Sequence, residues 1–132
     1  MRWSFVLLLA AFASTEPARA QSTPPAAGSP KFIEIGEDAI LSSRLIGLNV
    51  ESGAGESMGR IEDVVFSGGE ISGVVLSVGE VLGGGERFVA VDPSAIAINY
   101  VEADGKWRAT MNADLEQLRS APEFRYEGKW KR

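Results

Sequence analysis

The stretch MGRIEDVVFSGGEISGVVLSV, residues 58–78, decides the fold class. Two runs rich in Val and Ile lie on either side of the paired glycines Gly68 and Gly69. β-Branched residues favour strands, and glycines supply the positive φ angles that tight hairpin turns require. The stretch therefore predicts a β-hairpin in which Phe66 and Ile71 flank the turn.

Similar short runs, separated by glycine-rich or polar turns, lie on both sides of this hairpin. They cover residues 48–51, 87–91, 95–101 and 106–111. Regularly spaced strands without intervening helices predict a small barrel or sandwich. One short helix is expected at residues 113–120, with Asn112 as its N-cap and with Leu115 and Leu118 facing the sheet.

The first 20 residues have the organisation of a secretory signal peptide. Arg2 gives a positive start, residues 5–13 form an unbroken apolar run, and Ala18-Arg19-Ala20 is a small-residue cleavage site before Gln21. A membrane-spanning helix needs about 20 apolar residues, so the run is too short to be one. Cleavage after Ala20 predicts a periplasmic or secreted protein. Retention of the segment as a membrane anchor is the alternative.

Three further segments follow this N-terminal segment. Residues 21–31 hold three prolines among small and polar residues and predict a flexible leader. The folded domain is expected at residues 32–126, and its first four residues, FIEI, form either a short strand or an arm lying on the domain. Residues 127–132 form a basic tail that is expected to be solvated.

The residue types that the chain lacks exclude several chemistries. Its 132 residues include no Cys and no His, so disulfides, thiolate nucleophiles, Ser-His pairs and Cys- or His-ligated metals are excluded. With 18 acidic and 13 basic residues the formal net charge is −5, which disfavours nucleic acids and anionic lipid surfaces as partners. No enzymatic activity is expected, and no catalytic, cofactor-binding or metal-binding residue is assigned.

Three motifs suggest chemistry but have better structural interpretations. Gly83-Gly84-Gly85 lacks the Lys-Ser/Thr of a phosphate-binding loop, so it is interpreted as a structural loop. Glu62 and Asp63 are adjacent on a strand and point to opposite faces, unless a bulge reorients one of them. A buried Asp63 accepting backbone amides at such a bulge is the other structural option. Glu51 and Glu56 lack the spacing of calcium ligands and are placed in a hairpin.

The order and spacing of five segments resemble the PRC-barrel domain, a family named for the H subunit of the photosynthetic reaction centre. The segments are SRLIGLNV (43–50), MGRIEDVV (58–65), GVVLSVG (73–79), LGGGER (82–87) and FVAV (88–91), and the resemblance covers residues 41–124. It implies a mainly β fold, a small antiparallel β-barrel with one short C-terminal helix, which serves as a partner-binding or assembly module. Asp92 stands where many members have a proline, and Gly84 where they often have an apolar residue.

Four apolar residues are candidate contacts with a protein partner: Val81, Leu82, Trp107 and Trp130. Val81 and Leu82 either plug the barrel or form an exposed contact patch. The plug is favoured, because leaving both in water forfeits about 3 kcal/mol of burial. Trp107 is expected to cover the barrel, whereas Trp130 is either a loose end of the tail or a contact anchor.

Together these features predict an exported, non-catalytic protein-binding or assembly module of the bacterial envelope. The sequence does not identify its protein partner, and a homo-oligomer is compatible with the prediction. No cofactor and no nucleic-acid partner are expected, and membrane contact is not predicted. The alternatives are an accessory protein held at the membrane surface by an uncleaved signal anchor and, ranked lower, a carboxylate-dependent metal-binding protein.

Overall fold

The computed structural model describes residues 26–132, so the expected signal segment and the start of the leader lie outside the described residues. The chain divides into a first unit that ends at Glu34 and a second unit, Ile35–Arg132. Residues 26–36 have no regular secondary structure and are exposed, so the segment FIEI is not a strand. No helix within residues 26–132 is long and apolar enough to cross a membrane.

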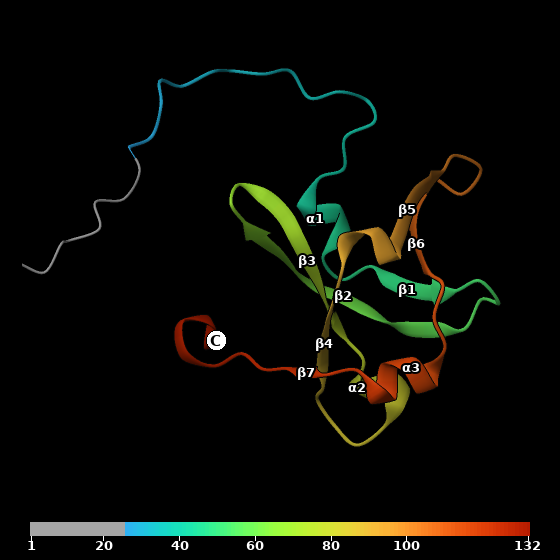
Figure 1. Ribbon diagram of the computed structural model, residues 1–132. Helices are drawn as coiled ribbons and strands as arrows, with labels where there is room; N and C mark the ends of the chain where they lie inside the picture. Colours follow the sequence, from blue (N-terminus) through green and yellow to red (C-terminus); the bar gives the residue numbers. More distant parts are fainter. Residues whose placement is uncertain (1–25) are drawn as a thin grey trace, which may run out of the picture. The chain divides into compact units, whose positions relative to one another are not determined.

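Seven strands of the described residues form one sheet in the order β5-β6-β1-β2-β3-β4-β7 (Figure 1). They are β1 (Asn49–Ser52), β2 (Ser57–Ser67), β3 (Glu70–Ser77), β4 (Phe88–Val91), β5 (Ile96–Val101), β6 (Lys106–Met111) and β7 (Glu123–Phe124). The mainly β class is confirmed. The first six strands begin and end within one residue of the positions that the sequence predicts.

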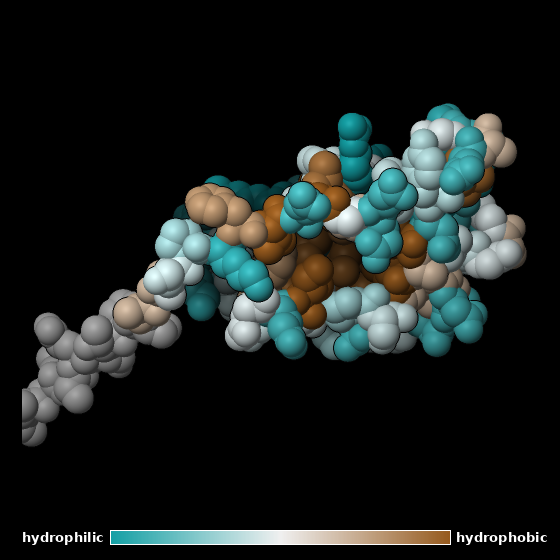
Figure 2. All heavy atoms as spheres, turned by 90° about the horizontal axis from the view of Figure 1, so that it is seen from above, coloured by the Kyte–Doolittle hydropathy of each residue, from teal (hydrophilic) through white to brown (hydrophobic). Residues whose placement is uncertain are grey.

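Hydrogen bonds do not close the sheet into a complete barrel. β5 and β7 are its two edges, and β7 has only two residues, so it offers little backbone for a closing pair. β1 and β6 run parallel, with Val50 opposite Ala109, whereas the other neighbouring strands are antiparallel. Seen from above, hydrophobic side chains lie in a hollow surrounded by hydrophilic ones (Figure 2).

The long hairpin of β2 and β3 is the centre of the sheet. Gly68 and Gly69 have φ angles of 62° and 85°, as a type I′ turn requires, and Phe66 pairs with Ile71. The predicted turn is thus confirmed. The β2–β3 register shifts between Ile61 and Asp63, so β2 has one extra residue there, Glu62, and forms a β-bulge.

The hydrophobic core is built from the inner side chains of the strands together with one helix. Its fully buried side chains are those of Val50, Met58, Ile61, Leu76, Val78 and Val89. Leu118 is also buried in the core cluster, and Leu115 packs against it. The docking of this short helix on the sheet agrees with the apolar spacing of its two leucines.

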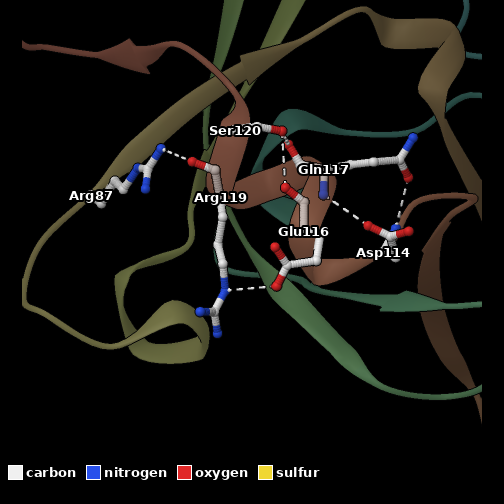
Figure 3. A network of polar contacts seen from close by, with 6 residues as sticks. All are labelled: Arg87, Asp114, Glu116, Gln117, Arg119 and Ser120. Carbon is white, nitrogen blue, oxygen red and sulfur yellow. Dashed lines mark hydrogen bonds and ion pairs between the residues drawn. The ribbon is translucent and has the colours of Figure 1, made fainter.

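That helix, α3 (Leu115–Ser120), begins two residues later than the sequence suggested. Its N-cap is Asp114 and not Asn112. The Asp114 carboxylate accepts a hydrogen bond from Gln117 N at 2.8 Å, and Gln117 Oε1 accepts one from Asp114 N at 2.9 Å (Figure 3). This reciprocal pair is a capping box, which satisfies two backbone N–H groups at the start of the helix.

Within residues 26–132 the structure has four short helical elements that the sequence does not predict: α1 (Ser42–Leu45), α2 (Gly79–Leu82) and the 3₁₀ turns η1 (Pro93–Ala95) and η2 (Gly128–Trp130). α2 begins where the backbone passes very close to a neighbouring loop, because a Cβ at Gly79 would clash with the carbonyl of Gly85. η1 is capped by Asp92, which accepts a hydrogen bond from Ser94 N at 2.9 Å. Asp92 is the residue at which many members of the PRC-barrel family have a proline, and here its side chain caps the turn instead.

A candidate protein-binding groove

A groove of about 340 Å³ lies beside the central hairpin, between β2 and the C-terminal segment of the chain. Its lining residues are Asp63, Val64, Val65, Phe66, Val75, Phe124, Tyr126, Trp130 and Arg132. Most of them are apolar or aromatic, and the few polar groups lie at defined positions. This composition is typical of binding sites for apolar groups.

Aromatic rings form one wall of the groove. The Tyr126 ring makes edge-to-face contacts with Phe88 and Phe124, with 5.0 Å between ring centres in each pair. The Trp130 ring centre lies 6.0 Å from that of Phe124. Such geometries are favourable for aromatic pairs. Phe88 is buried and pairs with Phe124 in the β4–β7 ladder, so this wall is anchored on the sheet.

Arg132 fastens the end of the chain to β2. Its Nη1 donates to Glu62 Oε1 at 2.7 Å, and its guanidinium carbon lies 3.8 Å from the centre of the Tyr126 ring. The hydrogen bond to Glu62 is the main cause that raises the pKa of Arg132 above its ordinary value. The basic tail is exposed, yet it forms η2 and folds back to contact the sheet.

The bulge in β2 brings two adjacent carboxylates to the same cluster. Glu62 binds Arg132, and Asp63 Oδ2 accepts a hydrogen bond from the Tyr126 hydroxyl at 3.5 Å. Burial is the largest cause that raises the pKa of Tyr126; the charge of Arg132 opposes the rise, and those of Asp63 and Glu62 add to it. Asp63 also accepts from Val64 N at 3.0 Å but is exposed, so it is not the buried carboxylate considered from the sequence.

The groove continues into an exposed apolar surface at the tip of the central hairpin. The exposed fractions are 38% for Val65, 65% for Phe66, 50% for Ile71 and 58% for Trp130. The described residues contain no group of three or more carboxylates that could hold a metal ion. The arrangement suits contact with apolar side chains or with an extended peptide.

The four contact residues suggested by the sequence do not lie together. Val81 and Leu82 are half-buried in α2, and Leu82 packs against the core. Trp107 is half-buried on β6, with its ring centre 5.2 Å from that of Tyr100. Of the four, Trp130 alone lines the groove.

Sequence reasoning missed Val65, Phe66, Tyr126 and Arg132 as members of this site. Val65 and Phe66 resemble ordinary strand residues, because the hydrophobic pattern does not show where a neighbouring strand stops. A weak signal for Tyr126 exists in its spacing from Phe124. Alternate aromatic residues are expected to lie on one side of an extended chain.

The model of the PRC-barrel domain family matches residues 37–116. The match covers more than half of the chain, and the chain belongs to this family. A search of curated proteins found no match. The matched residues include the central hairpin and its bulge, but they end before Phe124. The C-terminal wall of the groove therefore lies outside the family match.

Proposed function

We propose that this PRC-barrel protein is a non-catalytic protein-binding or assembly module of the bacterial envelope. The groove carries the proposal, because it joins an aromatic wall to the exposed side chains of Val65, Phe66 and Trp130. Clustered exposed apolar side chains mark interaction sites, and Trp is enriched among residues that dominate binding energy. The signal-like organisation of residues 1–20 supports export.

The chemistry of the groove supports a binding role over a catalytic one. Glu62 and Arg132 are bonded to each other. The raised pKa of Tyr126 keeps its hydroxyl protonated at neutral pH, which disfavours it as a nucleophile or base. The chain also has no His and no Cys, which are the usual activating base and thiol nucleophile.

Affinity capture from the envelope fraction of the protein's own host tests this function. The parent chain and two variants would be purified, and any stoichiometric companion identified by mass spectrometry. Phe66→Ser removes an exposed ring beside the groove, whereas the control Tyr100→Ser removes an exposed ring from β5, away from it. We expect Phe66→Ser to lose the companion and Tyr100→Ser to keep it. Equal capture by both variants would show that the groove is not the binding site.

The apolar run at residues 5–13 favours one alternative, an accessory protein held at the membrane surface by its uncleaved signal. Fractionation with mass measurement separates the two proposals. A chain starting at Gln21 in the soluble envelope fraction supports export with cleavage. The full-length chain in the membrane pellet supports the anchored alternative.

A further inference from the structure

One edge of β2 is open next to the groove. β1 accompanies β2 only as far as Arg60. The segment before β1 bonds the next residue, Ile61, whose N–H donates to Leu48 O and whose carbonyl accepts from Gly47 N. From residue 63 to residue 67, β2 pairs with β3 on one side, and no strand of the described residues pairs with the other. Such an edge offers backbone groups to an added strand. The Val64 N–H is already bonded to the Asp63 carboxylate at 3.0 Å, so an added strand would replace that bond at this position.

Proteins protect open edges with charges, prolines or a covering segment. The open part of β2 instead carries Val64, Val65 and Phe66, with Asp63 as its one charged residue. The same part of β2 lines the groove. An extended peptide added here would gain backbone hydrogen bonds from the edge and would place alternate side chains against the groove, as strand-addition sites do.

The chain itself contains a segment with matching properties. We call residues 31–38, KFIEIGED, the arm. Phe32, Ile33 and Ile35 in the arm are 93%, 74% and 66% exposed, although they are large apolar residues that favour strands. Ile33 and Ile35 are two positions apart, so in an extended arm they lie on one side.

The charges of the two surfaces are also complementary. The arm has three acidic residues, Glu34, Glu37 and Asp38, against one lysine. The tail that walls the groove has three basic residues, Lys129, Lys131 and Arg132, and no acidic residue from Gly128 onward. An arm lying along β2 with its isoleucines toward the groove turns Glu34 to the opposite side, so Glu37 and Asp38 are the carboxylates that it would bring near this tail.

We propose that the groove and the open edge of β2 bind the arm of a second copy of this chain. The inference rests on the proposed binding function and names its partner. Ile33 and Ile35 occupy the groove, the backbone of the arm pairs with residues 63–67, and Glu37 and Asp38 face the basic tail. The arm lies outside the secondary structure of its own domain, so it is available for exchange between copies.

Disulfide trapping tests the proposal cleanly, because the chain has no native cysteine. One preparation carries Ile33→Cys and the other Val65→Cys, each in the chain as purified from the envelope of an expressing host. Each chain then has one thiol, so every disulfide joins two copies. A disulfide forms only when the two Cα atoms come within about 7 Å.

The matched control replaces Val65→Cys with Ala97→Cys, on an exposed position of the edge strand β5. We expect the mixed dimer of the 33 and 65 variants to form at least about tenfold faster than that of the 33 and 97 variants, because docking raises the local thiol concentration. Ile35→Cys is paired with the 65 and 97 variants in the same way, to test the second position of the arm. Equal rates for both arm positions and the control would overturn the proposal.

Sedimentation provides a second readout that does not depend on cross-linking. We expect the parent chain to sediment as a dimer that weakens as salt is raised, and the Phe32→Ser/Ile33→Ser/Ile35→Ser variant to sediment as a monomer. The substituted residues are exposed in the single chain, so the variant should keep the urea midpoint of the parent at concentrations low enough to dissociate the parent dimer. A monomeric parent at high concentration would overturn this proposal. Capture of a different companion by that monomer would leave the proposed function standing, which separates the two failures.

Discussion

Arg132 Nη1 donates to Glu62 Oε1 at 2.7 Å, although the two residues are 70 positions apart in the sequence. Glu62 is the extra residue of the β2 bulge, and Arg132 also lies over the Tyr126 ring. The bulge therefore supplies the carboxylate that holds the C-terminal segment against the sheet. The ionisation of Tyr126 reports on this contact.

We predict that Tyr126 ionises above its ordinary pKa of about 10. Tyr100→Phe leaves Tyr126 as the one remaining tyrosine, and the ultraviolet absorbance of tyrosinate then follows it directly. In this background Arg132→Ala raises the pKa further, because the positive charge of Arg132 opposes the effect of burial. Asp63→Asn lowers the pKa. An unchanged titration in Arg132→Ala would show that Arg132 does not lie over the ring in solution.

The same shift makes stability depend on pH. The folded-state pKa of Tyr126 is raised, so the unfolded chain loses this proton first as the pH increases. The contribution of Tyr126 to stability is thus fully present below about pH 10 and is lost as the pH rises through the folded-state pKa. Urea unfolding at a series of pH values should show a decline that Tyr126→Phe reduces and Tyr100→Phe leaves in place.

Gly79→Ala should destabilise the domain strongly. An added Cβ would clash with the carbonyl of Gly85, which belongs to backbone and cannot rotate away. We expect a loss of about 1 to 3 kcal/mol, the usual cost of overpacking, in urea unfolding. Gly53→Ala is the control, because a Cβ there meets no atom within 4 Å, and its effect should stay within about 0.5 kcal/mol. Similar losses in both variants would contradict the close approach at Gly79.

The N-cap of α3 can be identified by two alanine substitutions. Asp114→Ala removes the carboxylate that accepts from Gln117 N, and we expect it to cost about 1 kcal/mol. Asn112→Ala should change the free energy of unfolding by less than about 0.5 kcal/mol, because Asn112 is exposed and outside the capping box. A larger cost at Asn112 than at Asp114 would assign the cap to Asn112.

Arg87 joins the start of β4 to the end of α3. Its Nη2 donates to the backbone carbonyls of Arg119 at 2.8 Å and Ala121 at 3.0 Å (Figure 3 shows the first of these bonds). Arg87→Ala should cost about 1.5 to 3 kcal/mol, since these bonds have a charged donor. The control Arg119→Ala loses only an exposed ion pair with Glu116 and should cost less than about 1 kcal/mol. Chemical denaturation compares them, and equal costs would contradict the bridging role of Arg87.

The limits of sequence reasoning follow from which interactions are local. The β2–β3 turn was predictable because Gly68 and Gly69 carry its whole signal within adjacent positions. The cap of α3 also had a local signal, since Asp114 and Gln117 have capping-box spacing, but Asn112 offered a competing N-cap residue. The bulge at Glu62 had no local signal, because it depends on how β2 and β3 align with each other.

The groove was not predictable for a related reason. It exists because β1 and the two residues before it pair with β2 only as far as Ile61 while β2 continues to Ser67, and because a distant arginine holds the tail. The local hydrophobic pattern predicts neither the end of this pairing nor the contact of the arginine. Trp130 was singled out by residue type alone, and its contact with Phe124 became visible only with the tail in place.

The parallel pairing of β1 with β6 also has a consequence for how the domain is made. Val50 of β1 pairs with Ala109 of β6, which is synthesised much later. One edge of β1 is therefore unpaired until most of the domain has been synthesised. Pairings between such distant residues close large loops and slow folding. A nascent chain that ends before Lys106 therefore lacks a complete sheet. If the protein is exported as we propose, this delay keeps the chain unfolded while it is threaded through a translocation pore.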